Sequence, residues 1–148
     1  MTLALSFENV YLRYGAYTVI EDFGTVIPEG SVTGLIGLNG AGKTTLIKAA
    51  LGLRDVSAGK IYVYGHSAGV SAAKKNLSYL PENFLPPEFL NGYEFLDFAC
   101  RFYQGNIDKH TILAYGDVLG MDDSILSRRI YTYSKGMRQK LGIMGAVL

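Results

Sequence analysis

The sequence of 148 residues predicts an α/β fold, with a strand-rich first half followed by a helical second half. Three observations support this prediction. Apolar and polar residues alternate over much of residues 1–82, as they do in half-buried strands. A glycine-rich stretch at residues 34–42 separates a short apolar run from a segment with helical spacing. Residues 83–133 contain further segments whose apolar residues recur at helical intervals.

The first strand is expected at residues 3–14, "LALSFENVYLRY", where the alternation has an offset in the middle. Its apolar positions are Leu3, Leu5 and Phe7, then Val10, Leu12 and Tyr14. A second strand is expected at residues 18–27, "TVIEDFGTVI", because Pro28-Glu29-Gly30 forms a turn signal directly after it.

The central part of the chain predicts a strand, a helix and two more strands. Residues 31–37, "SVTGLIG", read as a short apolar strand, and residues 43–53 as a helix. Residues 57–66, "SAGKIYVYGH", predict a turn and a strand, and residues 76–82, "NLSYLPE", a strand stopped by Pro81. The face of the helix that should be buried carries Leu46, Ile47, Ala50 and Leu51.

The second half of the chain is expected to be helical. The helices are predicted at residues 92–103, 108–121 and 122–130, within a helical subdomain that covers residues 83–133. Residues 134–148 form a last helix. We therefore expect one domain, residues 1–148, with a β-rich core at 1–82, this helical subdomain, and the last helix.

Composition limits the classes of function. Fourteen Lys and Arg balance thirteen Asp and Glu, for a net charge of +1, so charge gives no reason to expect a nucleic-acid partner. A single cysteine, Cys100, rules out an internal disulfide. No apolar run reaches the roughly 18 residues of a membrane span.

Residues 37–44, "GLNGAGKT", match the phosphate-binding pattern G-x-x-x-x-G-K-[ST]. Its glycines let successive backbone N–H groups point inward, and the helix that follows aims its positive end at the same place. Lys43 supplies a cation for the β- and γ-phosphates of ATP, Thr44 a hydroxyl for Mg²⁺, and Thr45 a group near the α-phosphate. A plain glycine-rich turn is the alternative. The nucleotide-binding residues are Gly37, Asn39, Gly40, Ala41, Gly42, Lys43, Thr44 and Thr45.

A second motif narrows the choice among nucleotide-binding families. "YSKGMRQK", ninety residues after Lys43, resembles the signature motif of the ATP-binding subunits of ABC transporters, whose common form is Leu-Ser-Gly-Gly-Gln. Ser134 and Gly136 match the serine and the second glycine. The positions that depart, Tyr133, Lys135 and Met137, resemble the variant found in exporter-like branches.

Two shorter stretches resemble the same family. "RYG" at 13–15 resembles the aromatic A-loop, which implies that Tyr14 stacks on adenine; an ordinary strand-end tyrosine is the alternative. "YLPEN" at 79–83 resembles the Q-loop, the junction that couples the nucleotide to the transporter, with Glu82 in place of the usual glutamine. That position implies a catalytic or Mg²⁺-contacting role for Glu82, against the alternative of a solvated carboxylate.

The resemblance implies an ATPase that powers transport as the cytoplasmic subunit of an ABC transporter, held at the membrane by a transmembrane subunit. Two copies pair head to tail, and Ser134 and Gly136 of one complete the ATP site of the other. The segment that carries the family's catalytic glutamate is missing, so we expect an incomplete domain. The alternatives are a soluble ABC-type ATPase acting on ribosomes or DNA, a non-hydrolysing ATP-binding fragment, and a P-loop kinase.

Overall fold

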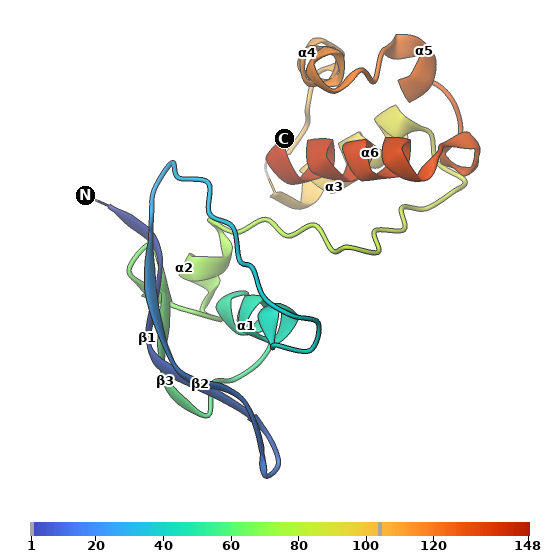
Figure 1. Ribbon diagram of the computed structural model, residues 1–148. Coiled ribbons are helices and arrows are strands. Elements are labelled where there is room, and N and C mark those ends of the chain that lie inside the picture. The colour runs from blue at the N-terminus through green and yellow to red at the C-terminus, as the bar shows by residue number, and fades with distance from the viewer. Residues whose placement is uncertain (1, 104) are drawn as a thin grey trace. The chain divides into compact units, whose positions relative to one another are not determined.

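The computed structural model describes residues 2–103 and 105–148 (Figure 1). The chain forms two compact units, Met1–Leu77 and Ser78–Leu148. The first is a sheet with helices, and the second is helical. The boundary between the units lies five residues before the predicted one at 82/83, and the last helix belongs to the helical unit.

An antiparallel sheet forms the framework of the first unit, with strand order β2-β1-β3-β4. Its strands are β1 (Leu3–Tyr14), β2 (Tyr17–Pro28), β3 (Ala58–Val63) and β4 (His66–Ser67). The two long strands form a hairpin in which Tyr14 faces Tyr17, so the turn consists of Gly15 and Ala16. Gly15 has a φ of 56°, a left-handed conformation that favours glycine.

A β-bulge explains the offset in the alternation of β1. Asn9 has a φ of 45°, and the pairing register with both neighbouring strands shifts around it. Phe7, Val10 and Leu12 can therefore all face the core, although the first two are three positions apart. Gly59 of β3 approaches the carbonyl of Asn9 so closely that a Cβ would lie 2.1 Å from its oxygen.

Helix α1 (Lys43–Ala50) packs on the sheet and closes the first core. Leu46, Ala49 and Ala50 are its buried residues. The predicted buried face was wrong at Ile47, which is 39% exposed. Ala49 is buried in its place, because the side of the helix that contacts the sheet is the one that carries Leu46, Ala49 and Ala50. The short helix α2 (Ser71–Lys74) completes this unit.

Two predicted strands are wrong. Residues 31–38 and 77–81 have no regular secondary structure. Val32 and Ile36 are 103% and 94% exposed, as expected of a segment outside any sheet. Within the described residues no strand pairs with either segment, and an apolar run adopts strand geometry only where a neighbour takes its backbone hydrogen bonds.

The helical unit has one core, built mainly from α3 (Gly92–Tyr103), α4 (Lys109–Leu119) and α6 (Lys135–Val147). Helix α5 (Asp123–Leu126) and the 3₁₀ turn η1 (Ile130–Thr132) connect α4 to α6. Leu96, Met121 and Leu141 are completely buried in it. The three predicted helices of this region are confirmed, although the third is reduced to the single turn of α5. None of the helices in the described part of the chain is long and apolar enough to span a membrane.

Candidate nucleotide-binding site

The glycine-rich loop leads directly into α1 and leaves the N-terminus of that helix open. The helix begins at Lys43, and its N-cap residue, Gly42, has a φ of 87° and provides no side-chain cap. Gly40 has a φ of 84°. Left-handed glycines in such a loop allow backbone N–H groups to point toward one place beside the positive end of the helix dipole. Residues 37–41 are all exposed, so the loop is accessible to an anion.

Packing on the sheet fixes the position of the loop. A Cβ on Gly42 would lie 2.7 Å from Val19 Cγ1 and 2.8 Å from Ile20 Cδ1. Only glycine therefore lets the start of α1 lie this close to β2. The sequence pattern predicted a glycine here for its backbone conformation, and the structure adds a steric reason.

The ammonium group of Lys43 lies over the loop. Its Nζ donates hydrogen bonds to the carbonyl oxygens of Gly37, at 2.7 Å, and Leu38, at 2.8 Å. A lysine ammonium has three donors, so one remains for an oxygen of a bound anion. Held in this way, the cation lies beside the converging N–H groups without an extended, freely rotating side chain.

The two residues after Lys43 are the threonines predicted to contact Mg²⁺ and the α-phosphate. Thr44 is exposed and Thr45 is half-buried, both in the first turn of α1. The described residues contain no cluster of three or more His, Cys, Asp or Glu side chains that could hold a metal.

Tyr14 lies at the end of β1 and is 53% exposed. The guanidinium carbon of Arg54 lies 3.7 Å from the centroid of its ring. Nothing in the sequence drew attention to Arg54, because it lies forty residues from Tyr14 and belongs to no motif. The contact appears only when the segment after α1 folds back along β1.

The helical unit holds the signature residues at the start of α6. Ser134 is the N-cap of this helix, and its Oγ accepts a hydrogen bond from the N–H of Met137 at 3.2 Å. Gly136 is exposed, and a Cβ on it would meet nothing closer than Ser134 Oγ at 3.9 Å. Tyr133 is a core residue, 4% exposed, whose hydroxyl donates to the Ile125 carbonyl. Burial raises the pKa of that hydroxyl.

Glu82 lies close to the same helix. It lines a hollow of about 440 Å³ together with Phe84, Tyr133, Lys135 and Arg138. The segment that carries Glu82 rests on Gly142 of α6, because a Cβ there would lie 2.6 Å from Leu80 Cδ1 and 2.8 Å from Phe84 Cδ1. Of the signature motif, Tyr133 and Lys135 line this hollow with Glu82, whereas Ser134 and Gly136 do not. All of them belong to the helical unit, while Tyr14 and the phosphate loop belong to the sheet unit.

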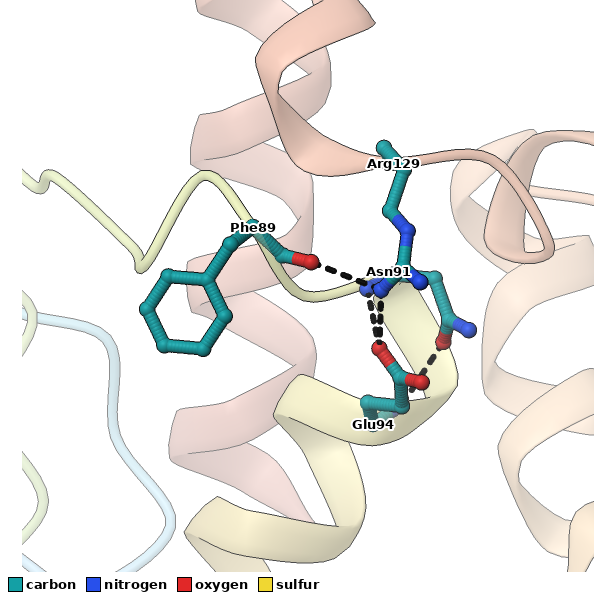
Figure 2. A network of polar contacts seen from close by, with 4 residues as sticks. All are labelled: Phe89, Asn91, Glu94 and Arg129. Carbon is teal, nitrogen blue, oxygen red and sulfur yellow. Dashed lines mark hydrogen bonds and ion pairs between the residues drawn. The ribbon is translucent and has the colours of Figure 1, made fainter.

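A polar network joins the segment after Glu82 to the segment before the signature motif (Figure 2). Nη1 of Arg129 donates to the Phe89 carbonyl at 2.6 Å and to Glu94 Oε2 at 2.9 Å. Glu94 and Asn91 also exchange two hydrogen bonds, each 2.8 Å long, which cap the start of α3. The ion pair is half exposed and contributes little stability on its own, so its main effect is to fix geometry.

The two basic residues that follow the signature glycine differ in their surroundings. Nη1 of Arg138 pairs with Glu88 Oε1 at 3.0 Å, the Arg138 side chain is 24% exposed, and its Nε is buried without a partner among the described residues. Lys140 is exposed.

The fold and the loop define a P-loop nucleotide-binding protein. The family model described as ABC transporter matches residues 20–148, so the chain belongs to the ABC transporter family. An uncharacterized ABC transporter ATP-binding protein of Bacillus subtilis, YhcH, is 36% identical over 100% of the chain and 48% of its own length. The bacitracin transport ATP-binding protein BcrA of Enterococcus faecalis is 30% identical, with the same coverage.

A solved ATP-binding subunit of an ABC transporter shares the fold. Its TM-score is 0.83 at 30% identity, over 97% of the chain and 61% of that structure. The chain thus spans about half the length of the two relatives, 48% of each.

Proposed function

We propose that the chain binds Mg-ATP as the nucleotide-binding part of an ABC transporter. The observation that carries the proposal is the phosphate loop, where two left-handed glycines, an uncapped helix start and a held lysine ammonium converge. Gly37, Asn39, Gly40, Ala41 and Gly42 provide the backbone that surrounds the phosphates. Their N–H groups and the helix dipole offset the negative charge of a polyphosphate.

The side chains around the loop divide the remaining tasks. Lys43 neutralises the terminal phosphates with the donor that the carbonyls leave free. Thr44 offers a ligand to Mg²⁺, and Thr45 contacts the α-phosphate. When bound, Mg²⁺ offsets the charge that develops on the transferred phosphoryl group. Tyr14 stacks on the adenine ring.

Hydrolysis belongs to a head-to-tail pair of copies. Ser134 and Gly136 of one copy close over the γ-phosphate that Lys43 of the other holds. An exposed serine hydroxyl at the start of α6, beside an open glycine, supports this role. Glu82 couples the nucleotide to a transmembrane subunit, as its position in the segment that resembles the Q-loop implies. The chain would then act at the cytoplasmic face of a membrane.

The name of BcrA supports a role in transport. BcrA is named for bacitracin transport, and the alignment covers the whole of this chain.

The test compares Lys43→Ala with Lys48→Ala, which lies in the last turn of the same helix. Both variants lose one positive charge, but only Lys43 reaches the phosphate loop. We expect Lys43→Ala to weaken Mg-ATP binding at least tenfold, or more than about 1.4 kcal/mol, and Lys48→Ala to change it little. Titration with a fluorescent ATP analogue measures both. Equal affinities for the wild type and Lys43→Ala would contradict the proposal.

A further inference from the structure

We propose that Arg54 braces the Tyr14 ring from one side, so that the opposite face of the ring stacks on the base of a bound nucleotide. This inference rests on the nucleotide-binding function proposed above and adds a residue to it. Arg54 would be a positioning residue, because it acts on the base only through Tyr14.

The contact between the two side chains is a stack. The guanidinium carbon of Arg54 lies 3.7 Å from the centroid of the Tyr14 ring, well inside the range of about 6 Å for a cation–π interaction. A guanidinium group is planar and weakly hydrated, so it covers an aromatic face better than an ammonium group does.

Arg54 is held in place independently of Tyr14. Its Nη2 donates a hydrogen bond to the carbonyl oxygen of Arg13. The segment after it is tied to β1 as well: the N–H of Arg13 donates to Ser57 Oγ at 3.1 Å, and the N–H of Ser57 donates to the Tyr11 carbonyl at 2.8 Å. The guanidinium group therefore cannot leave the ring without losing a backbone hydrogen bond.

No opposing charge competes for the guanidinium group. Among residues 2–103 and 105–148, no carboxylate forms an ion pair with Arg54. An arginine that only stabilised the surface would gain most from a nearby carboxylate. Here it combines a backbone carbonyl with an aromatic face, which fits the task of fixing the ring.

The free side of the ring is available to a ligand near the phosphate loop. Tyr14 is 53% exposed although Arg54 covers one face, so its exposed surface lies on the other face and the edge. Gly42 contacts Ile20, which pairs with Leu12 across the hairpin. Tyr14 follows Leu12 by two residues, or about 7 Å along the strand. The ring and the loop thus belong to the same end of the same hairpin.

The contact with Arg54 increases the affinity for the nucleotide because it reduces the conformational entropy that the Tyr14 side chain loses on binding. A tyrosine at a hairpin end has rotamer freedom, which stacking on a base would have to remove. Arg54 removes that freedom beforehand. We therefore expect Arg54→Ala to weaken Mg-ATP binding by about 2- to 10-fold, the range of a single aromatic stack.

The experiment measures the binding of two ligands to the 148-residue chain, Mg-ATP and magnesium tripolyphosphate, by isothermal titration. Tripolyphosphate has the phosphates but no base. Arg54→Ala should weaken ATP binding and leave tripolyphosphate binding unchanged. Arg13→Ala is the matched control, because it removes a cation from the residue next to Tyr14 but keeps the carbonyl that holds Arg54.

A double-mutant comparison separates the brace from a general structural effect. In a Tyr14→Ala background, Arg54→Ala should cause no further loss of ATP affinity. Unchanged or tighter ATP binding by Arg54→Ala alone, or equal loss of both ligands, would overturn the inference while leaving the nucleotide-binding function in place. A wild-type chain that bound neither ligand would overturn the proposed function itself, and the brace with it.

Discussion

Gly40 and Gly42 offer a controlled test of how the phosphate loop is fixed. They have nearly the same backbone conformation, with φ values of 84° and 87°, but different surroundings. A Cβ on Gly40 would meet nothing within 4 Å, whereas a Cβ on Gly42 would lie 2.7 Å from Val19 Cγ1. Alanine at either position suffers the same backbone strain, and alanine at Gly42 also overpacks the contact with β2.

The magnitudes follow from these two effects. A left-handed conformation costs alanine about 1–2 kcal/mol, and overpacking a tight contact costs about 1–3 kcal/mol more. We expect Gly40→Ala to lower the free energy of unfolding by about 1–2 kcal/mol and Gly42→Ala by about 2–5 kcal/mol. With a urea m-value of about 1–2 kcal/mol per molar, the difference of about 1–3 kcal/mol between the two variants should separate their midpoints by about 0.5–3 M.

The assay is hydrogen exchange of the 148-residue chain in increasing urea, detected by mass spectrometry on peptides from β1 and β2. These peptides report the unit that contains the loop. Equal midpoints for the two variants would refute the steric argument and leave only the backbone conformation as the reason for Gly42. A larger loss for Gly40→Ala would refute the packing described here.

Two further predictions concern the helical unit. Ser134→Arg should leave Mg-ATP binding by a single copy unchanged, because the proposed function assigns Ser134 to the site of a partner copy. A loss of affinity as large as that of Lys43→Ala, measured by the same titration, would indicate that Ser134 contacts the nucleotide of its own chain. Gly142→Ala should speed hydrogen exchange in the segment around Phe84, because a Cβ at residue 142 would lie 2.8 Å from the Phe84 ring. Overpacking this contact costs about 1–3 kcal/mol, which outweighs the gain of about 1 kcal/mol in helix propensity. Gly136→Ala, in an open part of the same helix, is the control and should stabilise the chain slightly; equal exchange in both variants would argue against the contact.

Local patterns in the sequence were enough to predict the features that depend on residues close together in the chain. The glycine turn before α1, the offset in β1 and the bounds of α3 are of this kind. A bulge shifts the apolar alternation where it occurs, and a cap or glycine turn involves only a few successive residues. The signature motif needed the resemblance to a family, because five residues alone have little specificity.

Tertiary structure decided the features that depend on neighbours far along the chain. Residues 31–38 and 77–81 have the composition of strands but no strand beside them, so they stay irregular. The residues around Tyr133 do not indicate whether its side chain is exposed with the rest of the signature motif or buried. Packing in the helical unit places it in the core. Arg54 is the clearest case, because its contact with Tyr14 spans forty residues and exists only once α1 and the segment after it have folded onto the sheet.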